Sequence, residues 1–476
     1  MKTSRRSFLR HAALAAGVAA LSPRSEAQTP GANDDIRLAV IGFHSRGKDH
    51  IKELNEIKGA RITALCDVDR DVLDWGVAEF RKKGREVEAY TDIRQLLESK
   101  NVDAVTIATP NHWHALAAIW SIQAGKDVYL EKPVSHTVWE GRRIVAAARQ
   151  HNKIVQTGTQ SRSSEGLREA VEWVRQGNLG KIKVSRGLCY KPRPSIGKTS
   201  SPLPIPASVD YDLWSGPAPV VPPHRSKFHY DWHWFWSYGD GDIGNQGIHE
   251  MDVARWFLGE PALSPRVLTV GGRFGYVDDG ETPNTLFSIH DYERAPLIME
   301  VRGLPARAGA KEMDAYEGAT IGVVVDCEGG YVVVPDYRSA KAFSPDGKLI
   351  KSFEGASSHF ENFLKAVRSR KETDLHAPIL DGHLSSALCH TSNISYRVGQ
   401  TQPAAAVRED LKSNTAASAT LARMTEHLAA NGVNLESTPL HLGLHLQMDP
   451  ASEQFTAPLQ ANVFLSRVYR VPFVVT

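Results

Sequence analysis

The sequence predicts an α/β domain with a parallel sheet, followed by an α+β domain with a largely antiparallel open sheet. Between residues 35 and 160, short apolar strands alternate with helical segments at the spacing of βαβ units. From about Lys181 the sequence pattern changes, and segments typical of strands are joined by longer connections. A chain of 476 residues is long enough for two such domains, each with its own core.

The first domain is predicted over residues 35–160. The run Asp103–Thr109 is apolar and β-branched and stops at Pro110, as a buried parallel strand does. Gly125 is typical of the C-terminal cap of a helix, here the one predicted over Trp113–Ala124. The predicted strands are Ile36–Gly42, Arg61–Asp67, Asp103–Thr109, Asp127–Leu130 and Lys153–Thr157. The predicted helices are Arg46–Ile57, a charged helix ending near Lys83, Thr91–Ser99, Trp113–Ala124 and Val138–His151.

The first 27 residues are typical of a twin-arginine export signal. Arg5 and Arg6 precede a run of small apolar residues over 12–21, and Ser25-Glu26-Ala27 offers a cleavage site. Because the run is too short to span a bilayer comfortably, we expect a periplasmic protein, exported by the twin-arginine machinery, without stable membrane insertion. Loss of the leader removes five basic residues and one acidic residue, so the formal charge of +2 becomes −2 and no basic run remains for nucleic acid.

The second domain is predicted over residues 161–476, including the C-terminal tail. Nine prolines between Pro192 and Pro223 predict an extended surface loop. Residues 403–420 are mostly small and polar, which favours a mobile connection, and the alternating leucines over 440–446 favour a strand. Four scattered cysteines without a C-x-x-C motif are expected to be buried, with no disulfide framework and no thiolate metal site. Further strands are expected at 266–274, 285–290, 296–301, 320–326 and 331–334, and helices at 358–368 and 380–398.

The turn after the first strand offers a dinucleotide site. Its sequence, Gly42-Phe43-His44-Ser45-Arg46-Gly47, departs from G-x-G-x-x-G at the middle position, where His44 would push a pyrophosphate outward or change its contacts. Asp67 lies 25 positions after Gly42, where an acid accepts hydrogen bonds from ribose hydroxyls and repels a 2′-phosphate. This favours NAD over NADP, although Asp67 could instead cap the next helix.

Charged residues follow a later strand of the same sheet. The strand Asp127–Leu130 delivers Glu131 and Lys132 at its carboxyl end, and Pro133 turns the chain. Since ligands bind at the carboxyl ends of strands in a doubly wound sheet, the Lys132 ammonium can point at a bound oxygen rather than lie on a solvated helix face. Gln160 and Arg162, just past the last strand, are candidate contacts for hydroxyl groups.

Two segments carry a resemblance to a known family. The stretches Ala108-Thr-Pro-Asn-His-Trp-His114 and Glu131-Lys-Pro133 resemble those of the glucose–fructose oxidoreductase and inositol dehydrogenase (Gfo/Idh/MocA) family. Later motifs extend the similarity from about Ile36 to the C-terminus. The resemblance implies a Rossmann dinucleotide-binding domain and an open-sheet substrate domain. It also implies cofactor contacts from Thr109, Pro110, Asn111, His112 and Glu131. No metal site is expected at His112 and His114, since no third ligand follows at usable spacing.

The segment Gly244–Asp252 resembles the family's substrate motif, in which an aspartate precedes the acid/base histidine by four residues. His249 matches the histidine, whereas Asn245 stands in the aspartate's place. An asparagine can orient a hydroxyl or the imidazole, but it cannot stabilise an imidazolium by charge. We expect His249 to take the proton of a sugar hydroxyl whose carbon loses hydride to the nicotinamide, while Lys132 donates a hydrogen bond to that oxygen. A buried structural histidine is the alternative.

Upstream of this motif, Trp232, Trp234 and Trp236 recur at every second position, with His233 among them. Aromatic faces stack on sugar rings, so Trp232 and His233 are candidate substrate contacts. A core or dimer strand explains the pattern equally well.

Export in the folded state suits a protein that carries a tightly bound NAD, or NADP, and resets it within each catalytic cycle. The family offers two such reactions: redox exchange between sugars, and glycosidic cleavage through transient ring oxidation and elimination. The second needs a base such as Tyr190, Tyr230 or Tyr238. The His/Lys pair favours the oxidoreductase, and a non-catalytic sugar- or dinucleotide-binding protein is the alternative of another class. The antiparallel sheet suggests a homo-oligomer.

Overall fold

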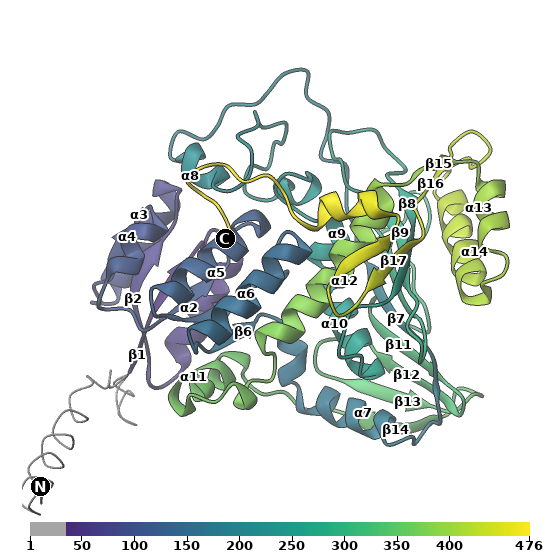
Figure 1. Cartoon of the computed structure of the whole chain (residues 1–476), viewed down its shortest axis with the longest axis horizontal. Coiled ribbons are helices and arrows are strands. Elements are labelled where there is room, and N and C mark those ends of the chain that lie inside the picture. Colours follow the sequence, from purple (N-terminus) through teal and green to yellow (C-terminus); the bar gives the residue numbers. More distant parts are fainter. Residues whose placement is uncertain (1–34) are drawn as a thin grey trace, which may run out of the picture.

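The computed structural model describes residues 35–476, so the predicted export signal lies outside the described residues. The described chain forms two sheets side by side, each carrying helices, and the last residues run back across the molecule toward the first sheet (Figure 1). Among these residues, no helix combines the length and the hydropathy that crossing a bilayer requires. All four cysteines are buried, as predicted.

The first domain contains β1 (Ile36–Ile41), α2 (Arg46–Glu56), β2 (Ala60–Cys66), α3 (Arg70–Lys82), β3 (Glu88–Tyr90), α4 (Ile93–Glu98), β4 (Ala104–Ile107), α5 (Asn111–Gln123), β5 (Asp127–Leu130), α6 (Val138–Gln150) and β6 (Val155–Thr157). Its strands are all parallel, in the order β3-β2-β1-β4-β5-β6. This confirms the predicted α/β sheet. The missed strand is β3, which has three residues and no buried side chain, and therefore leaves no hydrophobic pattern.

The second sheet has twelve strands. They are β7 (Ile182–Tyr190), β8 (Arg266–Gly272), β9 (Thr285–His290), β10 (Leu297–Arg302), β11 (Ile321–Cys327), β12 (Gly330–Val334), β13 (Ala340–Phe343), β14 (Leu349–Phe353), β15 (Gln400–Gln402), β16 (Leu440–Leu442), β17 (Leu446–Asp449) and β18 (Gln454–Ala457). The main path runs β14-β13-β12-β11-β7-β10-β9-β8-β16-β15, and only β7 and β10 pair in parallel. The predicted, largely antiparallel sheet is confirmed.

After β6 the chain also forms the helices α7 (Glu165–Arg175), α8 (Tyr211–Ser215), α9 (Gly241–Asn245), α10 (Gly247–Leu258), α11 (His359–Ser369), α12 (Ile379–Arg397), α13 (Ala404–Leu411) and α14 (Thr415–Ala430), some of which cover the two faces of this sheet. Helices α7, α10 and α12 share the main core with the strands. Helices α13 and α14 pack on the other face through Val407, Leu411 and Leu421, against β8, β9 and β10.

Two local expectations are wrong, and a third is confirmed only in part. Residues 403–420 are not a mobile connection, because their few apolar side chains are spaced to pack α13 and α14 on the sheet. The tryptophan-rich segment is not a strand: Asp231–Trp234 is a 3-10 helix, and Trp232 packs in a small aromatic cluster. The leucine alternation spans two strands, β16 and β17, with a break at Gly443, whose backbone N–H donates to Thr269 O.

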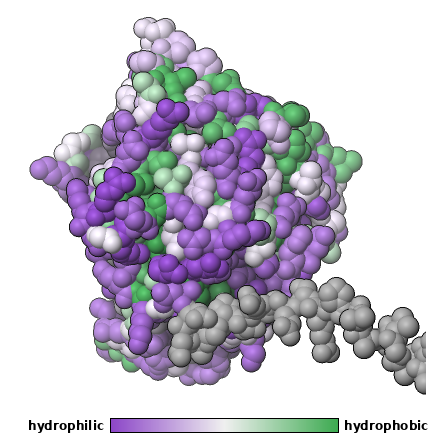
Figure 2. All heavy atoms as spheres, turned by 90° about the vertical axis from the view of Figure 1, so that its left-hand side faces the viewer, coloured by the Kyte–Doolittle hydropathy of each residue, from purple (hydrophilic) through white to green (hydrophobic). Residues whose placement is uncertain are grey.

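Late segments of the chain fasten the two domains together. Phe360 and Phe363 of α11 join the core beneath the first sheet, where Phe360 stacks on Tyr129 with ring centroids 4.3 Å apart. Near the C-terminus, Phe473 packs against Trp113, with ring centroids 5.5 Å apart. The face on the side of α3 and α4 is mainly hydrophilic, with hydrophobic side chains scattered among polar ones (Figure 2). The contacts of α11 and of the C-terminal residues hold the strand ends of the first sheet facing the second domain.

Candidate active site

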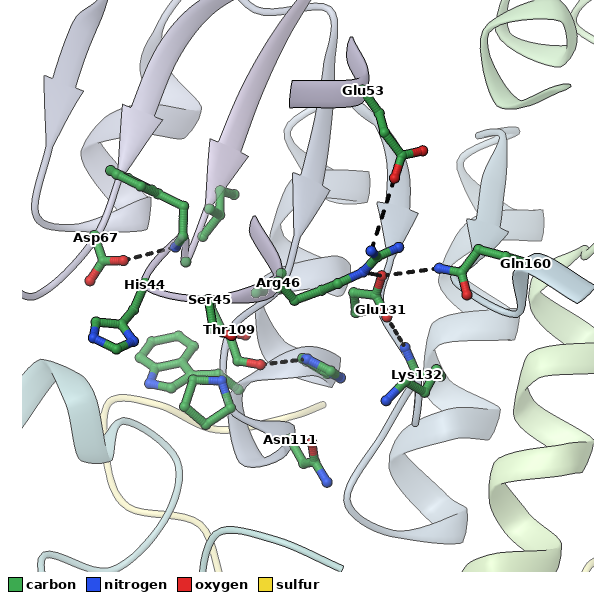
Figure 3. Close-up of a pocket in the computed structure, with 18 of the residues that line it drawn as sticks. His44, Ser45, Arg46, Glu53, Asp67, Thr109, Asn111, Glu131, Lys132 and Gln160 are labelled. Atoms are coloured by element: carbon green, nitrogen blue, oxygen red, sulfur yellow. Dashed lines mark hydrogen bonds and ion pairs between the residues drawn. The ribbon is translucent and has the colours of Figure 1, made fainter. Parts of the chain in front are cut away.

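A cavity of about 1010 Å³ lies at the carboxyl ends of β1, β2, β4 and β5, where residues of the second domain close over them (Figure 3). Ligands of doubly wound folds bind at this edge of the sheet. Fifteen of the predicted site residues line the cavity: Gly42, Phe43, His44, Arg46, Asp67, Thr109, Pro110, Asn111, Glu131, Lys132, Gln160, Trp232, His233, Asn245 and His249. Three predicted residues do not: Gly47, His112 and Arg162.

The turn between β1 and α2 has the close approach that a dinucleotide requires. Gly42 has φ +75°, and a Cβ there would lie 2.9 Å from the backbone nitrogen of Thr109. At Gly47 a Cβ would lie 2.2 Å from the Gly42 carbonyl oxygen, so this glycine shapes the turn without reaching the cavity. The N-cap residue Ser45 makes no side-chain capping bond to α2, which suits binding of an anion at this helix N-terminus.

Asp67 holds the turn from the neighbouring strand. Its Oδ2 accepts a hydrogen bond from the backbone N–H of Phe43 at 2.9 Å, and its Oδ1 accepts one from Asp69 at 3.0 Å. Burial raises the pKa of Asp67 to about 6, against the lowering effect of these bonds. The helix-cap alternative is wrong, because Asp69 caps α3 by accepting a hydrogen bond from the N–H of Asp71.

His44, at the middle position of the motif, stacks on His229 of the second domain. Their ring centroids lie 4.1 Å apart with an interplanar angle of 16°, and His229 Nε2 lies 2.9 Å from Asp69 Oδ2. Burial is the largest cause that lowers the pKa of each imidazole. Both residues line the cavity. His44 projects from the turn beside Asp67, at the end remote from Lys132 (Figure 3).

The residues after β4 divide into two groups. Thr109, Pro110 and Asn111 line the cavity, and Asn111 Nδ2 donates to Asp240 Oδ2 at 2.8 Å. His112 is fully buried outside it, with Nε2 2.8 Å from the backbone oxygen of Trp214. The predicted cofactor contact of His112 is therefore not supported: the helical backbone of α5 turns its side chain away from the cavity.

A partly buried ion pair forms at the end of β5. Glu131 Oε1 accepts hydrogen bonds from Arg46 Nε at 2.9 Å and from Gln160 Nε2 at 3.4 Å, and it lies 3.0 Å from His50 Nε2. Figure 3 shows Arg46 reaching from the turn toward Glu131. Burial acts to raise the pKa of Glu131, but Arg46 and His50 outweigh it and hold the pKa well below its ordinary value. The carboxylate therefore stays ionised and links the turn to the next strand end.

Lys132 and His249 both line the cavity, and the charge of Lys132 acts on the imidazole of His249. Lys132 Nζ donates to the backbone oxygen of Asn245 at 2.7 Å, which ties β5 to the end of α9. Burial, and then the positive charge of Lys132, hold the pKa of His249 well below its ordinary value. His249 Nδ1 is buried without a hydrogen-bond partner among residues 35–476. A neutral imidazole beside an ammonium can accept a proton from a hydroxyl group that the ammonium binds.

Not all of the predicted substrate residues reach the cavity. Trp232 and His233 line the cavity with stacked rings, their centroids 3.6 Å apart. Arg162 does not reach it, because its guanidinium pairs with Asp252 at 2.8 Å and with Asp381 at 3.0 Å in the interior. The predicted hydroxyl contact of Arg162 is therefore wrong. The sequence predicted the position of Arg162 just past β6 correctly. It did not reveal the two acidic partners of the guanidinium, because they lie far along the chain.

Sequence reasoning missed residues that reach the cavity from distant segments. His229 and Tyr337 belong to the second domain, and both line the cavity. Neither lies in a recognisable motif; only the concentration of histidine and aromatic residues around His229 was a signal. Of the three tyrosines considered as bases, Tyr230 lines the cavity, whereas Tyr190 and Tyr238 are buried elsewhere.

Two family models match parts of the chain, one in each domain. Residues 36–159 match the NAD-binding Rossmann fold of the GFO_IDH_MocA oxidoreductase family, and residues 168–279 match an oxidoreductase-family C-terminal alpha/beta domain, GFO_IDH_MocA_C2. The first match implies a dinucleotide. Such a ligand fits the turn formed by Gly42 and Gly47, the N-terminus of α2 and the carboxyl group of Asp67. The first domain is thus an NAD-binding Rossmann domain.

Individual relatives match in part. A "Glycosyl hydrolase family 109 protein" of Shewanella pealeana is 32% identical over 204 residues, or 38% of this chain and 45% of the relative. Myo-inositol 2-dehydrogenase of Thermotoga maritima is 27% identical over 225 residues, 47% and 55% of the respective chains. The chain thus spans about half the length of these relatives. The solved WlbA dehydrogenase of Bordetella pertussis, in complex with NADH and UDP-GlcNAcA, shares the fold, with TM-score 0.56 and 19% identity over 75% of this chain and 96% of that chain.

Proposed function

We propose that this chain, whose residues 36–159 and 168–279 match models of the Gfo/Idh/MocA oxidoreductase family, oxidises a hydroxyl group of one sugar or sugar derivative and returns the hydride to a second one, using an NAD that stays bound between turnovers. The observation that carries the proposal is that Lys132 and His249, whose imidazole is held neutral, line the same cavity as the glycine turn. A bound NAD would supply the hydride acceptor. After its bond to Asn245, the Lys132 ammonium keeps two N–H groups for a substrate oxygen, whose proton His249 accepts.

Retention of the cofactor is supported by the contact between the turn and the second domain. The stack of His44 on His229 closes over one end of the cavity, and His229 is anchored by Asp69. Nearby, the N–H of Arg70 donates to Ser208 O, and that of Asp210 donates to Val68 O. These bonds fasten the proline-rich loop to the end of β2. A dinucleotide bound along the strand ends would leave only after this contact opened.

The substrate class follows from the cavity and the relatives. Trp232 and His233 give the cavity an aromatic wall beside polar donors, which suits the alternating C–H and O–H faces of a sugar ring. One relative is named for oxidation of myo-inositol, and one structural neighbour was solved with a nucleotide sugar. We further propose twin-arginine export to the periplasm, a homo-oligomer, and use of NAD, with NADP as the alternative.

The test begins with cofactor content. The protein is purified without added dinucleotide and denatured, and the supernatant is assayed for NAD(H) and NADP(H). A near-stoichiometric amount supports the proposal. Myo-inositol, D-glucose and N-acetyl-D-galactosamine are then added to the loaded protein while nicotinamide absorbance is followed, with His249→Ala as the inactive control. A protein that contains no dinucleotide and binds none when it is added refutes the oxidoreductase, and leaves a protein that only binds sugars.

A second candidate is an NAD-dependent glycosidase. It is favoured by the relative from glycosyl hydrolase family 109 and by Tyr230, a tyrosine that lines the cavity. Elimination needs a base, and a tyrosine can act as one only when it is ionised. Release of nitrophenol from nitrophenyl glycosides, without net reduction of the bound cofactor, would establish this reaction instead.

A further inference from the structure

Gln246, one residue after α9, has a side chain that hydrogen-bonds through its oxygen and through both amide N–H groups. Its Oε1 accepts from Lys191 Nζ at 2.9 Å. Its Nε2 donates to Glu250 Oε1 at 3.1 Å and to the hydroxyl oxygen of Tyr337 at 2.7 Å. Because the lysine can only donate, it fixes which end of the carboxamide is oxygen, and the two N–H groups must then point at Glu250 and Tyr337.

This arrangement determines where the proton of Tyr337 can go. The phenol oxygen already accepts a hydrogen bond from Gln246, so its own O–H must point elsewhere. Within residues 35–476 no acceptor takes that proton. The side chain is 41% exposed and lines the cavity, and its ring centroid lies 5.0 Å from that of His249. Burial raises the pKa of Tyr337 to about 12, so the hydroxyl keeps its proton at neutral pH.

Resting on the oxidoreductase proposed above, we propose that Tyr337 donates a hydrogen bond to an oxygen of the substrate, and that Gln246 is a positioning residue that directs this hydroxyl into the cavity. Tyr337 and Lys132 then supply two donors near His249. The substrate class is a ring that carries a second oxygen beside the reacting hydroxyl. A monohydroxylated ring would leave the Tyr337 donor unpaired, and rejection of such an analogue is what a polar site of this kind produces.

The kinetic experiment uses the loaded full-length protein with myo-inositol, D-glucose, N-acetyl-D-galactosamine or cyclohexanol as hydride donor, and with a keto sugar in excess as hydride acceptor so that the bound NADH is reoxidised in each cycle. Tyr337→Phe keeps the ring and removes the donor, so kcat/KM for a polyol should fall about 3- to 30-fold, with no comparable loss for cyclohexanol. The matched control is Tyr331→Phe, which removes a hydroxyl from the same hairpin outside the cavity. Equal kcat/KM for wild type and Tyr337→Phe with an active polyol would overturn the inference.

The positioning role of Gln246 has its own test. Gln246→Glu keeps the size but removes the donor to Tyr337, so it should lower kcat/KM as Tyr337→Phe does. The double variant should be no worse than Tyr337→Phe alone, because both changes remove one interaction. Additive losses would refute the positioning role, whereas a loss of folding would show as a lower unfolding temperature.

A spectroscopic measurement decides the hydrogen bond without any substrate. 3-Fluorotyrosine is incorporated throughout, and the 19F resonance of residue 337 is assigned with Tyr337→Phe. Gln246→Glu should shift this resonance and raise its titration midpoint, because the wild-type amide donor favours the phenolate. An unmoved resonance would refute the bond. If no sugar reduces the bound cofactor, the oxidoreductase fails, while the 19F result still decides whether Gln246 directs Tyr337.

Discussion

The contact between His44 and His229 gives a quantitative prediction about cofactor release. His229→Ala removes the ring that stacks on His44 at 4.1 Å and also the bond to Asp69. A stacked aromatic pair contributes about 0.5–1.5 kcal/mol beyond its buried area. If the contact must open before the dinucleotide leaves, the dissociation rate should rise about 2- to 12-fold, since 1.4 kcal/mol corresponds to a factor of ten.

The assay loads the protein with NADH and displaces it with excess NAD⁺, while energy transfer from tryptophan to the bound nicotinamide is followed over time. The matched control is His445→Ala, which removes an exposed imidazole paired with Asp410 in the C-terminal segment. The control should release NADH at the wild-type rate. An unchanged rate in His229→Ala would refute the reasoning, and equal acceleration in both variants would indicate general loosening.

Three further changes probe the turn, the acid/base pair and the partly buried ion pair. Gly42→Ala should weaken NADH binding at least tenfold by calorimetric titration, because its Cβ would meet backbone at 2.9 Å and its φ of +75° is strained for alanine. Asn245→Asp should move the acid limb of the kcat/KM profile up by about one pH unit, since an added carboxylate favours the imidazolium of His249. Arg46→Met should lower the free energy of unfolding by about 1–3 kcal/mol at pH 7, because Glu131 loses its cationic partner. That difference should shrink as denaturant titrations move below about pH 4, because Glu131 becomes protonated there in the unfolded chain, whereas its depressed pKa keeps it ionised in the folded wild type until the pH is lower still.

The sequence predicted most of the first domain because its determinants are local. A buried parallel strand is a short apolar run, and the glycines at 42 and 47 mark a turn that no larger residue fits. The same logic located Lys132 at a strand end. The second domain was less readable: β13 and β14 have mixed burial along their length, and the helices over 404–430 contain too many small and polar residues for a clear periodicity.

The site residues that were missed or misplaced depend on contacts between distant positions. Arg162 lies in the predicted place, but Asp252 and Asp381 draw its side chain into the interior. Tyr337 reaches the cavity from a loop after β12, with no motif of its own. Such placements follow from tertiary packing, which periodicity and spacing along the chain do not encode.

The replacement of the expected aspartate by Asn245 shows which part of the site depends on side-chain identity. Lys132 is held by the backbone oxygen of residue 245, an acceptor that any amino acid supplies, so the exchange leaves the lysine anchored. What the exchange removes is a negative charge near His249, where burial and Lys132 already disfavour the imidazolium. Proton acceptance by His249 must therefore be assisted from the substrate side, and a hydrogen bond from Lys132 that makes the hydroxyl more acidic is the means the geometry supplies.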